Sequence, residues 1–162
     1  MNQIPPLKVI FVCMGNICRS PTAHGVFQAL VDDAGLHDLI EVESAGTHGY
    51  HVGSAPDLRS QKTALKNQVD LSRLRARRFL AQDFNDFDYV IGMDKDNLRD
   101  MLAIKPEQYS AMVDLLLKYS DKYTQDEIPD PYYGDDGFDL VFDMVKEGST
   151  GLLNHIRQKY SI

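Results

Sequence analysis

Short apolar runs recur along the chain at lengths that suit buried β-strands. The first, residues 9–12 (Val-Ile-Phe-Val), follows two prolines and is hydrophobic at every position, which is typical of a strand covered on both faces. Similar runs occupy 40–44 and 89–92, whereas the run at 112–117 fits a strand or a turn of helix equally well. These runs are the predicted strands of one sheet.

Between these runs, apolar residues recur at helical spacing. Pro21 and Pro56 suit the first turns of two helices, because proline lacks the N–H that would be unpaired there. Gly35 suits the end of the first helix, and Asp94 is a suitable N-cap for a short third helix. We therefore expect one helix from Pro21, one from Pro56 to about residue 67, and one after Asp94.

The C-terminal part of the chain begins with a polar segment, 121–137, whose prolines and glycines predict a loop. Helical spacing resumes at Phe138, and the Gly-Ser-Thr-Gly run at 148–151 leaves open whether that helix is interrupted. Strands that alternate with helices indicate parallel crossovers. We expect a single α/β domain over residues 1–162, a doubly wound, four-stranded parallel sheet with helices on both faces.

Composition narrows the classes of function. A chain of 162 residues can bury a core of its own, and its 24 acidic and 17 basic residues give a net charge of -7. That charge argues against general binding to nucleic acid or to a membrane surface. The first residues lack the pattern of a signal peptide, and two cysteines do not make a disulfide framework. A cytoplasmic location is expected, and the oligomeric state is left open.

Chemically reactive residues gather in the run Cys-Met-Gly-Asn-Ile-Cys-Arg-Ser-Pro at 13–21, between the first strand and the first helix. At this junction of an α/β fold, backbone N–H groups and the helix dipole favour an anion. Gly15 would let the backbone approach an anion closely and take angles that other residues resist. Cys13 would be favoured as the nucleophilic thiolate, and Arg19 offers a planar fork for two phosphoryl oxygens. The run predicts attack on phosphorus.

Other interpretations of these residues are weaker. Taken alone, Cys18 is most simply a buried small hydrophobe. A zinc site would lack a second pair of ligands, because the five histidines are scattered. Neither GxxxxGK[ST] nor GxGxxG occurs in the sequence. No metal and no cofactor are therefore expected.

The run VCMGNICRSP, which begins one residue before Cys13, resembles the signature loop of the low-molecular-weight protein tyrosine phosphatases. Further matches follow in the family's order at 44–47 (SAGT), 88–91 (DYVI), 93–94 (MD), 97–99 (NLR) and 130–134 (DPYYG). The resemblance therefore spans nearly the whole chain.

The resemblance implies a protein tyrosine phosphatase that hydrolyses phosphotyrosine and small aryl phosphates. Cys13 would attack phosphorus to form a phosphocysteine, Arg19 would bind the phosphoryl oxygens, and Asp130 would protonate the leaving phenolate and then activate water. Without the resemblance, an aspartate before a proline is most simply a turn residue. The substrates would be phosphotyrosine proteins, and phosphate or vanadate should inhibit by occupying the loop.

Supporting roles also follow from the resemblance. Asn16, Ser20 and Ser44 would hold the loop in shape and assist the thiolate, while Ser20 suits a helix N-cap as well. The loop that binds phosphate would comprise Met14, Gly15, Asn16, Ile17, Cys18 and Ser20. Aromatic residues would wall the substrate cleft: Tyr50, Tyr132 and Tyr133.

One position departs from the family. A histidine is common before the Ala-Arg pair of the segment after the second helix, and Leu74 stands there instead, so the hydrogen-bond network of that histidine must be rebuilt or missing. Around it, Arg73, Arg75, Arg77 and Arg78 form a dense basic run. A solvated polar segment is the simpler interpretation of this run, and a docking patch for acidic phosphopeptides is the alternative.

Two other functions share parts of the motif. An arsenate reductase needs further cysteines to relay a disulfide outward, and none follows Cys18. A catalytically dead phosphate-binding module would lack the nucleophile or the acid, and Cys13, Arg19 and Asp130 are all present. Members of the family with a second loop cysteine are known for reversible oxidation, which implies a Cys13–Cys18 disulfide formed after attack by peroxide.

Overall fold

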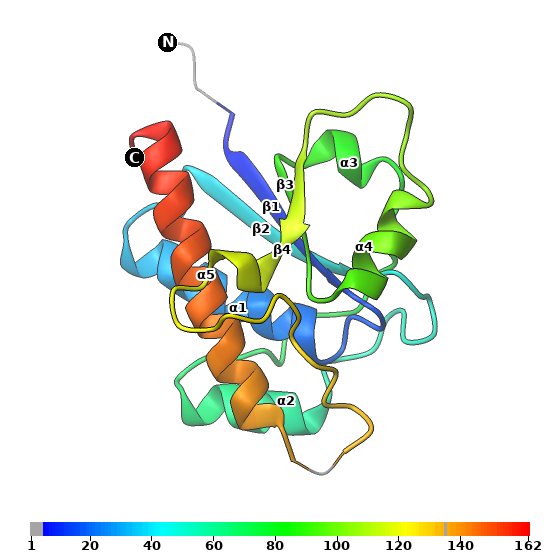
Figure 1. Cartoon of the computed structure of the whole chain (residues 1–162). Helices are drawn as coiled ribbons and strands as arrows, with labels where there is room; N and C mark the ends of the chain where they lie inside the picture. The colour runs from blue at the N-terminus through cyan, green and yellow to red at the C-terminus, as the bar shows by residue number, and fades with distance from the viewer. Residues whose placement is uncertain (1–4, 135) are drawn as a thin grey trace.

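A parallel four-stranded sheet forms the centre of the computed structural model, which describes residues 5–134 and 136–162 (Figure 1). The strands are β1 (Leu7–Cys13), β2 (Ile40–Gly46), β3 (Tyr89–Gly92) and β4 (Met112–Leu115). Their order across the sheet is β2-β1-β3-β4. The predicted α/β class and the four parallel strands are therefore confirmed.

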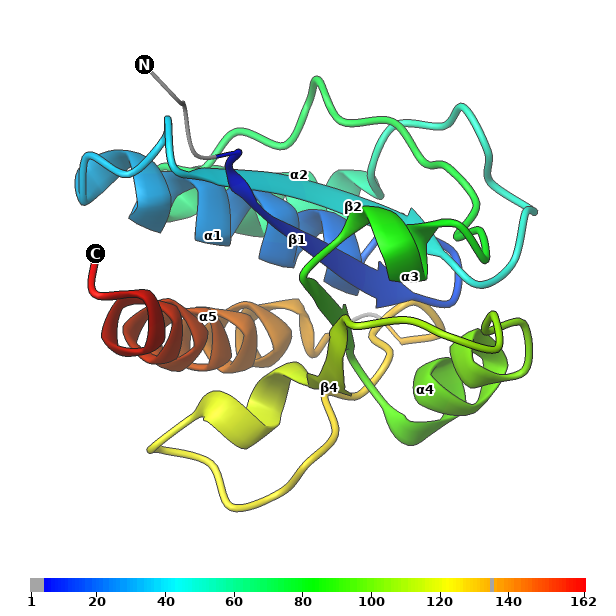
Figure 2. The ribbon, with the colours of Figure 1, turned by 90° about the horizontal axis from the view of Figure 1, so that it is seen from above.

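Helices cover both faces of this sheet (Figure 2). They are α1 (Arg19–Asp33), α2 (Leu58–Lys66), α3 (Asp83–Asp86), α4 (Lys95–Leu102) and α5 (Phe138–Tyr160), with a 3-10 turn, η1, at Leu116–Tyr119. Side chains of β1 alternate between the faces: Phe11 packs on the side of α1 and α5, and Val12 on the side of α3 and α4. No helix in the described part of the chain is long and apolar enough to cross a bilayer.

The strand order places a ligand site at the end of β1. The chain leaves β1 to form β2 on one side and later returns to form β3 on the other, so the direction of winding reverses beside β1. In register, Cys13 lies opposite Gly46 at the end of β2, and Val12 lies opposite Gly92 at the end of β3. The loops after all three strands therefore meet at one edge, where open α/β sheets bind ligands.

Local signals set most element boundaries. Gly35 follows the end of α1 with a φ of 70°, and Asp94 caps α4 in a reciprocal capping box with Asn97, as predicted for a glycine stop and an aspartate cap. The second helix begins at Leu58 rather than at Pro56, because the side chain of Asp57 accepts a hydrogen bond from the N–H of Arg59 and acts as its N-cap.

The two open interpretations in the C-terminal half are now decided. The run at 112–117 is both structures in turn, a strand followed by η1. The helix α5 runs without a break. Its glycines lie where the helix packs closely against η1: a Cβ on Gly151 would stand 1.7 Å from the Tyr119 carbonyl oxygen, and one on Gly148 would lie 2.8 Å from the Leu116 side chain. The loop predicted at 121–137 contains no helix or strand in its described residues, and residue 135 lies outside them. The domain extent of 1–162, which includes 1–4, stays a prediction.

Candidate active site

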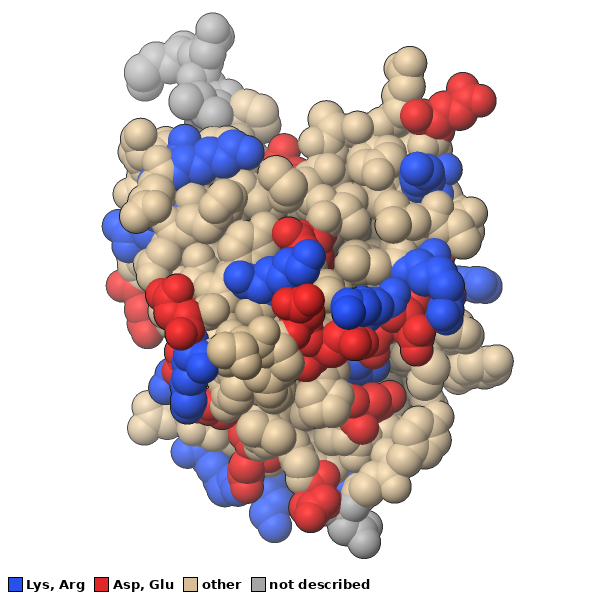
Figure 3. All heavy atoms as spheres, in the orientation of Figure 1, with Lys and Arg blue, Asp and Glu red and all other residues tan. Residues whose placement is uncertain are grey.

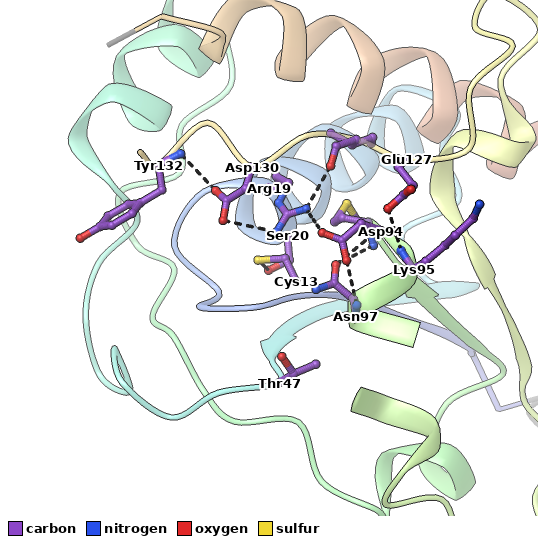
Figure 4. Close-up of polar contacts among 12 residues, drawn as sticks. Cys13, Arg19, Ser20, Thr47, Asp94, Lys95, Asn97, Glu127, Asp130 and Tyr132 are labelled. Carbon is purple, nitrogen blue, oxygen red and sulfur yellow. Dashed lines mark hydrogen bonds and ion pairs between the residues drawn. The ribbon is translucent and has the colours of Figure 1, made fainter. Parts of the chain in front are cut away.

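The segment 13–20, here called the phosphate loop, connects β1 to α1 (Figure 4), and side chains of the loop bond to one another. The Sγ of Cys13 lies 3.0 Å from the hydroxyl oxygen of Ser20, and the amide of Asn16 donates to that oxygen at 2.7 Å. A thiolate can only accept, so the Ser20 hydroxyl donates to Cys13 in that state. Ser20 is not the N-cap of α1: the cap residue is Cys18, which makes no side-chain capping bond.

The unusual backbone angle of the loop belongs to Asn16, with a φ of 56°, and not to Gly15, so that part of the prediction for Gly15 is wrong. The side chain of Asn16 stabilises this conformation, because its Oδ1 also accepts from the N–H of Arg77 at 3.1 Å. A glycine suits position 15 because a side chain there would crowd the neighbouring loop: a Cβ would stand 3.0 Å from Cδ2 of His51. A side chain on Gly46 would collide with the loop, 2.8 Å from the Met14 carbonyl oxygen.

Arg19 is buried at the base of the loop, where carboxylates flank its guanidinium (Figure 4). Its Nη1 donates to Asp94 at 2.5 Å and to the Ile128 carbonyl at 3.0 Å, while its Nη2 lies 3.6 Å from Asp130. Burial opposes its charge, but the Cys13 thiolate, Asp94 and Asp130 together raise its pKa above the ordinary value. The Nε, which has no hydrogen-bond partner among the described residues, and Nη2 form one edge of the fork.

Asp130 lies on the segment 128–134, here called the acid loop, and both ends of this loop are held. The N–H of Ile128 donates to the Met93 carbonyl after β3, and the N–H of Tyr132 donates to Oδ1 of Asp130 at 3.1 Å. From α2, Arg59 donates to the carbonyls of Gly134 at 2.7 Å and Tyr132 at 3.1 Å. The Asp130 carboxylate is therefore placed across Arg19 from Asp94, on a loop that contacts two other elements.

A cavity of about 420 Å³ opens above Cys13 between the phosphate loop and the acid loop. Its floor includes Met14, Gly15, Ile17, Cys18 and Arg19. Tyr50 stacks on His48 on one wall, whereas Tyr132 packs edge-on against Tyr133 on the other. Exposure is 82% for Tyr50 and 80% for Tyr133 but 38% for Tyr132, so Tyr132 is the most firmly packed of the three tyrosines. The structure thus brings the three predicted cleft tyrosines to one cavity.

Comparison with known proteins agrees with this geometry. The family model described as low molecular weight phosphotyrosine protein phosphatase matches residues 8–161. The chain belongs to this family. A Streptomyces coelicolor low molecular weight protein-tyrosine-phosphatase is 42% identical over 94% of this chain and 94% of its own. The crystal structure of YfkJ from Bacillus subtilis superposes with a TM-score of 0.91 at 33% identity, covering 98% of this chain and 99% of that one. A Drosophila arginine phosphatase, also 33% identical, has a TM-score of 0.85 and covers 93% of this chain and 98% of its own.

In this phosphatase the Ser44 hydroxyl bonds to a histidine on α1, whereas the segment after α2, where the family commonly has a histidine, carries Leu74. His24 on α1 shares a hydrogen bond with the Ser44 hydroxyl, with Nδ1 3.0 Å from Oγ, and Leu74 packs against the main core. Burial lowers the pKa of His24 to about 4, so the imidazole is neutral at pH 7. Ser44 therefore bonds to α1, and Asn16 and Ser20, not Ser44, bond within the phosphate loop.

The second loop cysteine of the phosphatase is buried beneath the loop. Cys18 packs with Ile17, Ala76 and Phe138, and burial raises the pKa of its thiol to about 12. Both cysteines are free thiols in the structure. Cys18 is therefore placed near the nucleophile in a neutral, protonated form.

Three sets of residues that contribute to the site were not predicted from the sequence. Asp94, which holds Arg19, was assigned only a helix cap, although its place after β3 puts it at the same sheet edge as Cys13. His48 and His51 line the cavity from the loop after β2, where the position of the loop was the available signal. Arg59 had no signal, because its contacts with the acid loop join residues more than seventy positions apart.

Proposed function

We propose that Cys13, Arg19 and Asp130 carry out the phosphatase reaction of this family on phosphotyrosine. The observation that supports this most directly is their juxtaposition: Cys13 and Arg19 bound one side of the cavity, and Asp130, more than a hundred positions away in sequence, closes it within 3.6 Å of Arg19. The phosphate loop supplies the nucleophile and the anion cradle, and the acid loop supplies the proton.

In the first step the thiolate of Cys13 attacks phosphorus, the S–P bond forms and the P–O bond to the phenol breaks. Asp130 donates its proton to the leaving oxygen. Since Nη1 of Arg19 is occupied by Asp94 and Ile128, its Nε–Nη2 edge is the one that binds two phosphoryl oxygens. In the second step the Asp130 carboxylate takes a proton from water, which attacks phosphorus and releases phosphate and the thiolate.

The cleft favours a phenyl leaving group. A phosphoryl group held above Cys13 places its leaving group between Tyr50 on one wall and Tyr132 and Tyr133 on the other. Aromatic side chains pack against a phenyl ring by stacked or edge-on contact. The Drosophila arginine phosphatase shares this fold, but the likeness does not indicate which phosphorylated residue this chain acts on, because fold alone does not determine the substrate. Tyrosine phosphoproteins are the proposed substrates.

The remaining parts of the proposal concern inhibitors, metals and compartment. Phosphate and vanadate inhibit competitively, since each fits the cradle and the fork of Arg19. Hydrolysis proceeds with a strong chelator present, because the nucleophile and the acid are both side chains of this chain. The two free cysteines support a reducing, cytoplasmic environment.

Turnover of aryl phosphates tests these roles. Cys13→Ser abolishes turnover, and Asp130→Asn slows it by roughly two to four decades for poor leaving groups. For leaving groups that are strong acids the Asp130→Asn loss shrinks, because their departure needs no proton. A loss that is uniform across leaving groups removes Asp130 as the acid, and residual activity in Cys13→Ser close to wild type removes Cys13 as the nucleophile.

A further inference from the structure

The arginine run after α2 lies against the wall of the cleft. Four backbone hydrogen bonds join 76–79 to the loop 46–54: the N–H groups of Gly46 and Gly53 donate to Arg77 and Ala76, and those of Ala76 and Phe79 donate to Ser54 and Gly46. The loop 46–54 includes Tyr50 and both cleft histidines. The arginines are therefore fixed to the element that forms one wall of the substrate cleft.

Within this run the arginines differ in what they bind. Arg77 is paired with Asp83 at 3.0 Å and with Glu43 at 3.4 Å, so its charge is neutralised locally. Arg75 and Arg78 are exposed, and neither has a carboxylate within ion-pair distance among the residues that the structure describes. Within the described residues, Arg75 donates to the backbone carbonyls of Ser72 and Leu74. Their two positive charges therefore face solvent without compensation.

Arg78 lies directly beside the cleft loop. Its Cδ is 3.6 Å, and its Nη1 4.0 Å, from the point where a Cβ on Gly49 would stand, and Gly49 immediately precedes Tyr50. Arg78 therefore lies beside the loop that carries Tyr50, and Arg75 adjoins Ala76, which is bonded to Gly53 and Ser54 of the same loop. On the face shown in Figure 3, basic and acidic side chains are intermingled.

The opposite wall carries negative charge at Asp130. The segment that leads to it, 121–130, contains four acidic residues and one lysine in the sequence. The loop 46–54 has no charged residue besides its histidines, and Arg78 beside Gly49 and Arg75 next to Ala76 add positive charge on its side. Acidic residues of a bound peptide are repelled by one wall and attracted to the other.

We infer that Arg75 and Arg78 form a docking surface for acidic residues that flank phosphotyrosine in the protein substrate. The inference rests on the proposed function for its ligand, and it adds the sequence context and the orientation of the peptide in the cleft. Because both arginines are exposed, the contribution is a modest, salt-sensitive gain in affinity.

Peptide binding to the full-length Cys13→Ser variant tests the surface without turnover. Two phosphotyrosine peptides are compared by fluorescence anisotropy, one with glutamates on both sides of phosphotyrosine and one with glutamines. We expect the glutamate peptide to bind roughly fivefold more tightly at low ionic strength and the preference to disappear at high salt. Arg75→Glu combined with Arg78→Glu should abolish or reverse the preference, and the milder Arg75→Gln with Arg78→Gln should reduce it.

Arg157→Glu combined with Lys159→Glu is the matched control, because it reverses two positive charges, as the double substitution does, on the exposed surface near the C-terminal end of α5, and it should keep the wild-type preference. Equal binding of the two peptides, or an unchanged preference in the doubly substituted protein, overturns the inference. Failure of the proposed function is recognised separately, as absent hydrolysis of p-nitrophenyl phosphate by the wild-type protein.

Discussion

The phosphate loop and the acid loop are built on different principles. In the phosphate loop, Cys13, Asn16 and Ser20 bond to one another within eight positions of sequence and are almost fully buried. Most residues of the acid loop lie at the surface, and its contacts come from Arg19 and the Met93 carbonyl at one end and from Arg59 at the other. The side chains of the anion cradle therefore bond to one another, with added support from the N–H groups of Arg77 and Thr47, whereas the position of Asp130 depends on residues far away in sequence. Substitutions that affect one loop should leave a different kinetic signature from those that affect the other.

The largest effect is expected for Arg19→Lys. An ammonium group cannot offer two parallel N–H donors, so kcat/KM for aryl phosphates should fall by roughly two to three decades. The inhibition constant of vanadate should rise in parallel, because the cradle itself is damaged. Arg99→Lys, on the exposed surface of α4, is the control and should behave as wild type. Near-normal activity of Arg19→Lys contradicts the clamp.

Asp94→Asn should have the next largest effect, a loss of about one to two decades that is the same for all leaving groups. Asparagine still caps α4, so thermal stability should change little, but the charge that holds Nη1 of Arg19 is lost. Asp130→Asn makes the same change on the other side of Arg19 and should depend strongly on the leaving group. A leaving-group dependence in Asp94→Asn as steep as in Asp130→Asn would remove the distinction between the two carboxylates.

Arg59→Ala should loosen the acid loop and leave the cradle intact. Without donors to the carbonyls of Tyr132 and Gly134, the Asp130 carboxyl is less often in position, so turnover of poor leaving groups should fall about tenfold. Vanadate should bind as it does to the wild-type protein. Weakened vanadate binding would show that the two loops are mechanically coupled.

Oxidation concerns the phosphate loop alone. Peroxide converts the Cys13 thiolate to a sulfenic acid, and the Cys18 thiol can displace water from it to form a disulfide that dithiothreitol reduces. Because burial raises the pKa of Cys18 to about 12, the capture should be slow near neutrality and should accelerate as pH rises. Phosphate should protect, and Cys18→Ser should recover less activity, with the difference growing from pH 7 to pH 9. Equal recovery of both proteins at every pH argues against the disulfide.

The mildest variant, His24→Gln, should leave turnover at pH 7 almost unchanged and alter only the pH dependence of folding. The pKa of His24 is about 4 in the folded protein and 6.5 in the unfolded chain, so protons bind the unfolded state first as pH falls. Its contribution to stability is present above pH 6.5 and is lost towards pH 4, by up to about 3 kcal/mol. Urea titrations at pH 7 and pH 5 should show a smaller difference for His24→Gln than for wild type.

Sequence alone determined the parts that depend on neighbouring residues. The first three strands, the glycine that ends α1, the Asp94 cap and the candidate nucleophile with its arginine could be predicted, because strand composition, capping and the helix N-terminus act over a few positions. The resemblance to known phosphatases added Asp130, which composition and spacing could not distinguish from a turn residue.

Only the tertiary structure decided how the distant parts meet. Asp94 reaches Arg19 because β3 lies beside β1 in the sheet, and Arg59 holds the acid loop because α2 packs on the same side as α5. The glycines of α5 permit contact with η1 rather than breaking the helix, and His24 on α1 bonds Ser44 on β2. Each of these contacts depends on strand order and on helix packing, which arise from burial across the whole chain rather than from any local segment.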